Sequence, residues 1–189
     1  AAARAKGEAA DDTQILFENE DLTAPLELCY RSLVDCGLEH IANGPLLDTI
    51  RRAHTFGLPL IRLDIRQEAA RHAEAVAEIV DYLGMGDYTA WSEPERQKFL
   101  LRELQGRRPL VPRGWQPSES VREVLATCEV VARQTPEALG SYVISMASQP
   151  SDVLSVILLL REAGMTFPMR VVPLFETLSD LQGAPDAMA

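Results

Sequence analysis

Apolar residues follow two different spacings along the chain, and each spacing predicts a different kind of element. A repeat every three or four residues, typical of an α-helix with one buried side, recurs through much of the sequence. Short apolar runs, typical of buried strands, lie between these stretches. The expected helices cover about residues 23–36, 45–53, 70–83, 92–104, 118–133 and 152–163, and the expected strands cover about 59–66, 141–147 and 169–174.

Residues that commonly cap helices mark where several of these helices begin. Ser92 and Glu95 form the pattern of a capping box, in which each side chain accepts a backbone amide of the other residue. Thr23, Ser118 and Ser151 also precede helical repeats and are expected to be N-caps, because a hydroxyl oxygen can accept an unpaired amide of the first turn.

The order of the elements predicts an α/β fold that is predominantly helical. The last two strands are joined by a single helix of about a dozen residues, which is typical of parallel strands. Residues 1–20 lack a clear repeat and are expected to be a flexible N-terminal segment, and residues 21–189 are expected to form the folded part. Charged residues follow the apolar strands, which is how α/β barrels place ligand-binding groups at the ends of their strands. Three parallel strands are too few to close a barrel. The chain is therefore expected to supply part of an active site and not the whole of one.

Composition narrows the range of partners. The net charge of −10 and the pI of about 4.8 argue against nucleic acid or an anionic membrane as the main partner, although local arginines can still bind an anion. No apolar run approaches the roughly 20 residues of a membrane span. The three cysteines have no metal-ligand spacing, and their odd number is typical of a reduced, cytoplasmic protein.

Alternation along the first expected strand places charged side chains on one face and apolar ones on the other. We expect Asp64 to neutralise Arg62 in an internal ion pair, because an isolated buried charge is costly. Arg66 is the last residue of the expected strand and therefore lies at the C-terminal end of the sheet. A guanidinium there suits a phosphate or a carboxylate. A structural salt bridge from Arg66 to Glu68 or Glu74 is the alternative.

Two further residues at element boundaries carry candidate chemistry. Glu176 follows the third strand, where a carboxylate could bind Mg²⁺ or Mn²⁺ or could instead cap a helix at residues 177–181. His72 is expected on a helix surface, and none of the three histidines has the spacing of a metal site or a catalytic pair. Nucleophilic triads and glycine-rich phosphate loops are absent from the sequence.

Several short motifs follow one another from residue 56 to residue 178. They are Phe56-Gly57-Leu58, Leu63-Asp64-Ile65-Arg66-Gln67-Glu68, Arg71-His72, Asp81-Tyr82-Leu83-Gly84, Arg107-Arg108-Pro109-Leu110, Tyr142-Val143-Ile144-Ser145-Met146-Ala147, Ser151-Asp152-Val153-Leu154 and Pro173-Leu174-Phe175-Glu176-Thr177-Leu178. In this order they resemble the phosphoenolpyruvate carboxylase family of the bacterial type, from about residue 21 to the C-terminus.

The resemblance implies a fold, a reaction and a set of site residues. The fold would be part of a (β/α)₈ barrel, a TIM barrel, to which this chain contributes the first three parallel strands and extra helices. The reaction would be that of a lyase that joins bicarbonate to phosphoenolpyruvate, giving oxaloacetate and phosphate, with Mg²⁺ or Mn²⁺. This carbon dioxide fixation replenishes the tricarboxylic acid cycle, and the full-length enzyme would be a cytoplasmic homotetramer. Arg66 would hold the substrate phosphate, Leu174 would line the pocket near the methylene group and CO₂, and Glu176 would bind the metal.

Other family features are missing from these 189 residues. The family's catalytic histidine, its second metal-binding carboxylate with a neighbouring lysine, and its Arg-Gly-Gly loop have no counterpart here. We therefore expect no catalytic residue in this chain, weak or absent metal binding, and no activity of the chain alone. The alternative is a stand-alone, non-catalytic binding or scaffold module that reuses this segment of the barrel.

Overall fold

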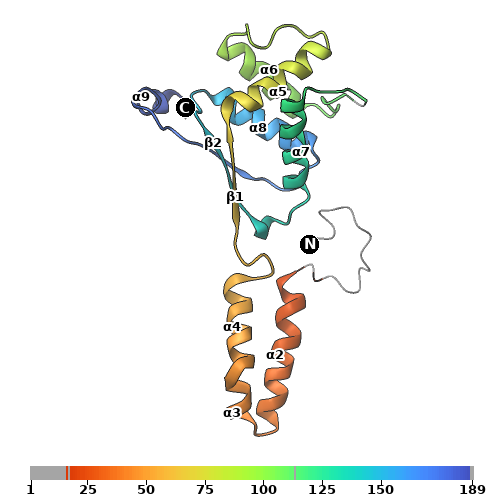
Figure 1. Ribbon diagram of the computed structural model, residues 1–189, viewed down its shortest axis with the longest axis vertical. Helices are drawn as coiled ribbons and strands as arrows, with labels where there is room; N and C mark the ends of the chain where they lie inside the picture. Colours follow the sequence, from red (N-terminus) through yellow and green to blue (C-terminus); the bar gives the residue numbers. More distant parts are fainter. Residues whose placement is uncertain (1–15, 17, 113, 188–189) are drawn as a thin grey trace. The chain divides into compact units, whose positions relative to one another are not determined.

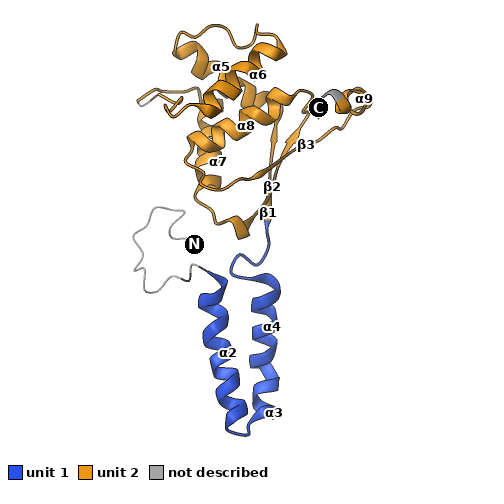
Figure 2. Ribbon diagram, turned by 180° about the vertical axis from the view of Figure 1, so that it is seen from behind, with its two compact units in different colours: residues 1–62 blue, residues 63–189 orange. Residues whose placement is uncertain are grey.

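The computed structural model describes residue 16 and residues 18–112 and 114–187 (Figure 1). The chain divides into two compact units, residues 1–62 and residues 63–189 (Figure 2). Most of the structure is helical, and its strands form one parallel sheet. The expectation of a predominantly helical α/β fold is therefore confirmed.

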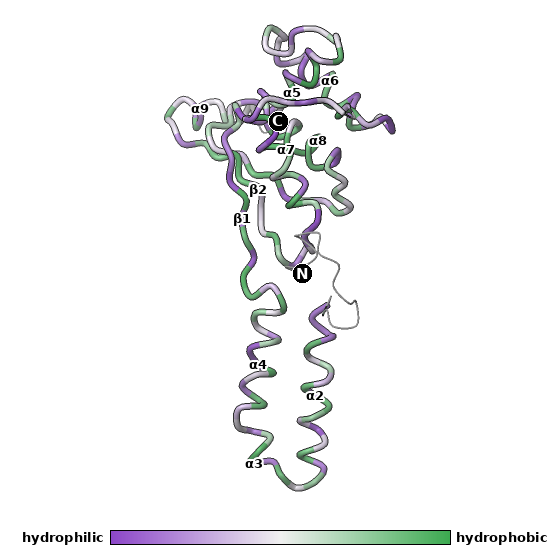
Figure 3. The backbone as a smooth tube through the Cα atoms, turned by 45° about the vertical axis from the view of Figure 1, so that its right-hand side comes forward, coloured by the Kyte–Doolittle hydropathy of each residue, from purple (hydrophilic) through white to green (hydrophobic). Residues whose placement is uncertain are grey.

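The first unit is a helical hairpin. It contains α2 (Asn19–Asp35), α3 (Glu39–Ile41), a π-helical turn η2 (Ala42–Leu46) and α4 (Leu47–Phe56). The two long helices are joined by a 2.7 Å hydrogen bond between His54 Nε2 and Glu27 Oε1. Hydrophilic and hydrophobic residues alternate along both helices (Figure 3), as expected for helices with one apolar side.

The N-terminus of α2 differs from the prediction. Thr23 is buried inside the helix and is not its cap. The helix begins earlier because the amide of Glu18 donates to Asp21 Oδ2 at 2.9 Å. Residues 1–15 and 17 of the segment expected to be flexible lie outside the described residues, and Asn19 and Glu20 already belong to α2.

The second unit is built on the sheet. Its strands are β1 (Leu63–Glu68), β2 (Leu139–Ser145) and β3 (Arg170–Pro173), which run parallel in the order β1-β2-β3. β1 begins at residue 63 and not at 59, because residues 57–61 form turns and bends. β1 is therefore shorter at its N-terminal end than the sequence predicted, whereas β2 begins at Leu139, two residues before its expected start.

Helices of the second unit alternate with the strands. They are α5 (Ala69–Tyr82), α6 (Glu93–Gln105), α7 (Glu119–Ala132), the 3₁₀ turn η3 (Pro136–Ala138), α8 (Pro150–Glu162) and α9 (Leu178–Ala187). No helix among the described residues combines the length and the apolar character that a bilayer span requires.

Two of the three predicted caps in this unit are confirmed. The amide of Ser92 donates to Glu95 Oε2 at 2.8 Å, and Ser118 Oγ accepts the amide of Val121 at 3.3 Å. Ser151 is not a cap, since α8 begins one residue before it. Its amide and hydroxyl instead donate to the carboxylate of Glu93 at 2.9 and 2.6 Å, which joins α8 to α6.

The core lies between the helices and one face of the sheet, which we call the covered face. Tyr142 and Ile144 of β2 are fully buried on this face, with Ile65 and Val171 beside them on the outer strands. Helices α5, α6, α7 and α8, together with the loop residues Tyr88 and Leu110, supply most of the other core residues. We call the opposite side the open face; its β2 residue Val143 is only half-buried.

A single guanidinium fastens α8 to the end of α6. Arg161 Nη1 donates to three backbone carbonyl oxygens, those of Glu103 at 2.7 Å, Leu104 at 2.7 Å and Gly106 at 3.2 Å. These carbonyls lie at the C-terminus of α6, where a helix leaves its last acceptors without partners of its own. The side chain of Arg161 therefore completes α6 from a different helix.

Candidate functional site

Three segments far apart in the sequence end at the same edge of the sheet. Because the strands are parallel, their C-terminal ends lie together. Arg66 lies near the C-terminus of β1, and the amide of Leu174 continues the ladder past β3 by donating to the carbonyl of Ile144 at 2.8 Å. Glu176 follows two residues later. We call this edge the C-terminal rim.

Arg66 and Leu174 also belong to the same face of the sheet. Arg66 pairs with Val143, which pairs with Val172, and Leu174 comes two residues after Val172. Side chains two residues apart along an extended chain lie on one side, so these residues belong to the open face. The exposed fraction of Leu174 is 37%, large for an apolar residue. The rim thus combines a cation with an apolar side chain on the face of the sheet opposite the described core.

The guanidinium of Arg66 has no partner among the described residues. It is exposed and forms neither an ion pair nor a side-chain hydrogen bond there. The alternative salt bridges to Glu68 and Glu74 are not formed, and Glu74 accepts the hydroxyl of Ser120 at 2.6 Å instead. A planar fork of donors without a protein partner can bind an oxyanion bidentately.

The predicted ion pair between Arg62 and Asp64 is wrong. Asp64 Oδ1 accepts the backbone amide of Ser141 at 2.8 Å, and the described ion pairs do not include Asp64. The strand β2 carries one extra residue opposite Asp64, which frees this amide from the regular ladder. A Cβ atom at Gly140 would collide with the Asp64 carboxylate, so the close approach requires a glycine.

Glu176 remains available for a ligand, but it does not form a metal site with other described residues. Asp180 Oδ2 accepts the amides of Thr177 at 2.9 Å and Glu176 at 3.3 Å, and Thr177 Oγ1 accepts the amide of Asp180 at 3.1 Å, so Thr177 and Asp180 form a capping box at the start of α9. These bonds, with the backbone of Thr177 first, lower the pKa of Asp180. The alternative that Glu176 is this cap is therefore wrong. Within the described part of the chain no three His, Cys, Asp or Glu residues come together as metal ligands, and Glu176 alone does not fit a complete site.

Met146 at the rim was missed by the sequence reasoning. It directly follows the last residue of β2 and has a φ of 53°, a left-handed conformation that a side chain other than glycine rarely adopts. Its exposed fraction is 52%. No motif or spacing in the sequence signals this turn.

His72 is the clearest error among the predicted surface residues. It is fully buried, and its Nε2 lies 2.8 Å from the hydroxyl of Tyr142, which joins α5 to β2. Burial, helped by the positive charge of Arg71, lowers the pKa of His72 to about 4. Burial also raises the pKa of Tyr142. Both groups are therefore uncharged at neutral pH, as a buried hydrogen-bonded pair requires.

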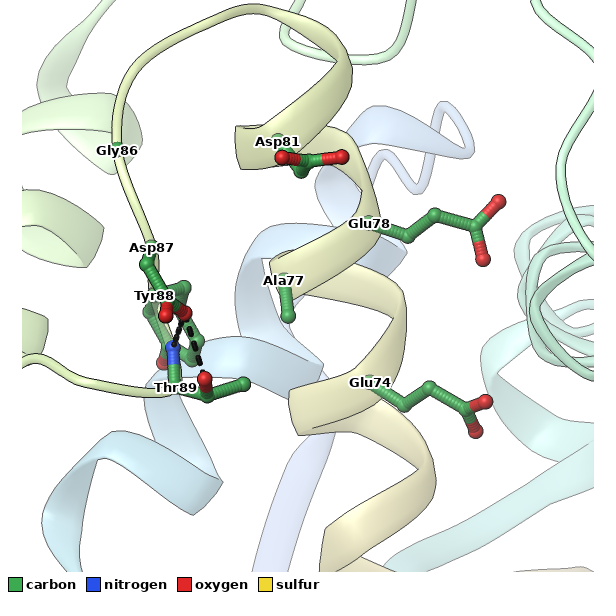
Figure 4. A pocket seen from close by; sticks show the side chains of 8 residues that line it. All are labelled: Glu74, Ala77, Glu78, Asp81, Gly86, Asp87, Tyr88 and Thr89. Atoms are coloured by element: carbon green, nitrogen blue, oxygen red, sulfur yellow. Dashed lines mark hydrogen bonds between the residues drawn. The ribbon is translucent and has the colours of Figure 1, made fainter.

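A hollow of about 440 Å³ lies away from the rim, between α5 and the loop at residues 86–89 (Figure 4). Its lining is strongly acidic and includes Glu74, Glu78, Asp81 and Asp87. Asp87 Oδ1 accepts the amide and the hydroxyl of Thr89 at 3.0 and 2.5 Å, and these bonds lower its pKa. Carboxylates repel an anionic substrate, so this hollow does not suit a phosphate compound.

The comparisons with known proteins agree on one family. The family model described as phosphoenolpyruvate carboxylase matches residues 1–189, which includes the first 20 residues that carried no motif. The chain is 84% identical over its whole length to the phosphoenolpyruvate carboxylase of Marinobacter nauticus and covers 22% of that protein. It is 62% identical over 186 residues to the Hahella chejuensis carboxylase, covering 96% of the chain and 21% of the relative. For the Shewanella oneidensis carboxylase the identity is 60% over 174 residues, covering 92% of the chain and 20% of the relative. The chain thus spans about a fifth of the length of the curated relatives it matches.

Proposed function

The chain belongs to the phosphoenolpyruvate carboxylase family, and from this membership we propose that it works as part of a longer enzyme. That enzyme joins bicarbonate to phosphoenolpyruvate and releases oxaloacetate and phosphate. The observation that carries the proposal in the structure is the exposed guanidinium of Arg66 at the C-terminal rim, which has no partner among the described residues and belongs to the same open face as Leu174. In the family's manner, the longer enzyme would be a cytoplasmic homotetramer.

The sheet fits the first three strands of a (β/α)₈ barrel. In such a barrel one face of the sheet packs under helices and the other lines the interior, and ligands bind at the C-terminal ends of the strands. The covered face, with the buried Tyr142 and Ile144, corresponds to the face that packs under helices. The open face corresponds to the one that would line the interior of the barrel. The remaining strands would come from chain outside these 189 residues.

We assign Arg66 to the phosphate of the substrate. Phosphoenolpyruvate carries two anionic groups and one small apolar methylene group, and a guanidinium binds a phosphate through two parallel N–H donors. Because Arg66 has no partner among the described residues, its donors need not be released from a salt bridge before the substrate binds. Leu174 would contact the uncharged methylene end and the incoming CO₂.

Glu176 is proposed as one carboxylate ligand of the Mg²⁺ or Mn²⁺ ion that the family uses. The described residues supply no complete ligand set, so the other ligands and the catalytic histidine would lie elsewhere in the longer enzyme. Hard divalent cations are often held by only one or two protein carboxylates together with water and substrate. We therefore expect the 189-residue chain alone to form no oxaloacetate.

The test uses the carboxylase of Marinobacter nauticus with its matching segment replaced by this chain, which we call the exchanged carboxylase. We expect it to form oxaloacetate in a coupled assay. In Arg66→Gln the KM for phosphoenolpyruvate should rise about 10- to 100-fold, the value of a hydrogen-bonded charge pair, with little change in the KM for bicarbonate. The melting temperature should stay unchanged, because Arg66 forms no ion pair or side-chain hydrogen bond with the residues that the structure describes.

Arg62→Gln is the matched control, because it removes the same charge four residues earlier and should leave both KM values unchanged. An unaltered KM for phosphoenolpyruvate in Arg66→Gln would remove Arg66 from the phosphate site. A folded exchanged carboxylase that forms no oxaloacetate would contradict the proposed function and would favour the non-catalytic scaffold module.

A further inference from the structure

The backbone at the end of β2 adopts a conformation that costs its residue energy. Among the described residues, Leu60 and Met146 are the non-glycine residues with a positive φ, 64° and 53°. For an L-residue this conformation brings Cβ close to the following carbonyl oxygen, and glycine avoids the contact. Non-glycine residues held in this conformation are often found at functional sites.

The left-handed turn at Met146 changes which face of the sheet the following side chains belong to. Tyr142 and Ile144 are buried on the covered face, and continued alternation would put residue 146 there as well. Instead the exposed fraction of Met146 is 52%, while that of the next residue, Ala147, is 1%. The left-handed turn thus withdraws a long apolar side chain from the core and leaves it exposed at the C-terminal rim.

Met146 occupies the middle of this rim. It follows Ser145, which pairs with Glu68 of β1, two residues beyond Arg66. On its other side the amide of Leu174 is bonded to the carbonyl of Ile144. The strand of the proposed phosphate ligand and the segment with the exposed Leu174 therefore flank Met146.

We propose that Met146 is a specificity-determining residue of the carboxylation site, and this rests on the proposed function. Its thioether side chain forms, with Leu174, an apolar wall against the methylene carbon of the enol phosphate. Arg66 holds the charged end of the substrate, so the exposed apolar side chains at the same rim suit the uncharged end. A flexible, polarisable methionine packs closely against a small apolar group and leaves no room for a larger one.

The test compares two substrates in the exchanged carboxylase. One is phosphoenolpyruvate, and the other is its analogue with one extra methyl group on the methylene carbon. In Met146→Gly the ratio of kcat/KM for the analogue to kcat/KM for phosphoenolpyruvate should rise about tenfold or more, the usual value of one methyl group in an apolar pocket. The melting temperature should be unchanged or higher, because glycine adopts this φ without strain.

Leu60→Gly is the matched control, because it relieves a similar backbone conformation at a residue that precedes β1 in the sequence. It should leave the substrate ratio unchanged. Met146→Leu keeps an apolar wall and should keep the ratio of the unsubstituted enzyme. If Met146→Gly does not fold, Met146→Ala is expected to raise the ratio instead.

Two results would overturn this inference without touching the proposed function. One is an unchanged substrate ratio in Met146→Gly with full activity on phosphoenolpyruvate. The other is a lower melting temperature with an equal loss of activity on both substrates, which would show a role in packing alone. An exchanged carboxylase inactive before any substitution would instead contradict the proposed function, and the inference with it.

Discussion

The two faces of the sheet differ in what holds their side chains. On the covered face Tyr142 and Ile144 are fully buried, and Tyr142 is bonded to His72 of α5. On the open face Arg66 has no partner among the described residues, and Leu174 stays partly exposed. Neighbouring residues of one strand thus serve two purposes, because alternation sends one side chain into the core and the next to the site. The contrast teaches that folding and binding can be separated residue by residue within a single strand.

The largest difference in stability should appear between substitutions of two neighbouring residues of β2, one on each face of the sheet. Ile144→Ala removes a fully buried side chain and should lower the free energy of unfolding by about 2–5 kcal/mol. Val143→Ala, on the open face, should lower it by about 1 kcal/mol or less, because Val143 is only half-buried. Urea unfolding of the chain measures both values. Equal losses would show that the two faces are packed alike.

The covered face should also make stability depend on pH through His72. Its pKa in the folded state is about 4 and the ordinary value is 6.5, so between these values the unfolded chain binds a proton that the folded chain does not. The free energy of unfolding should therefore fall as the pH drops from about 6.5 to about 4, by up to about 3 kcal/mol from this group.

Unfolding of His72→Gln across the same pH range checks this expectation. The variant should lose this part of the pH dependence, because no titrating ring remains at the site. His54→Gln, which replaces an exposed histidine of α4, is the control and should keep the dependence. An unchanged pH profile in His72→Gln would contradict the burial of a neutral His72.

A smaller effect on the free energy of unfolding should come from the contact between Asp64, on the open face, and Gly140. Gly140→Ala places a Cβ against the Asp64 carboxylate and should cost about 1–3 kcal/mol of unfolding free energy. In the double variant with Asp64→Ala the two losses should not add, because the collision disappears with the carboxylate. Gly183→Ala, where a Cβ meets no atom within 4 Å, should cost nothing. Additive losses would show that Asp64 and Gly140 do not contact each other.

The parts of the fold that depend on near neighbours were predictable from the sequence. The capping box of Ser92 and Glu95 involves residues three apart, and Ser118 caps its own helix over the same distance. The parallel pairing of β2 and β3 followed from one short crossover helix. In each case the pattern and the partner lie within a few residues or one strand–helix–strand unit, so the sequence contains the information.

The errors arose where a distant residue or a competing neighbour decided the structure. Ser151 was predicted as a cap, but Glu93, 58 residues away, accepts both its amide and its hydroxyl. Thr23 was displaced from its expected cap position by Asp21, which starts the helix earlier. A hydroxyl before an apolar repeat indicates a helix start without telling which of several polar residues takes the role.

The candidate site was predictable in position but not in detail. Strand ends alone indicated that Arg66 and Glu176 would share one end of the sheet, whereas their roles came from the resemblance to the family. The burial of His72 could have been predicted, because it lies four residues before the buried Val76 on the same side of α5. The contact of Asp64 with Ser141 spans 77 residues, and no local pattern predicts it.

The hydrogen bonds from Arg161 to three carbonyls couple the local unfolding of α6 to that of α8. The side chain of Arg161 bonds α8 to the carbonyls of Glu103, Leu104 and Gly106, of which only the Glu103 carbonyl also accepts a described backbone amide, that of Gly106. The two helices should therefore open together rather than one after the other. A protease that cuts the chain between residues 107 and 117 would therefore sever the connection in sequence while the two pieces stayed attached.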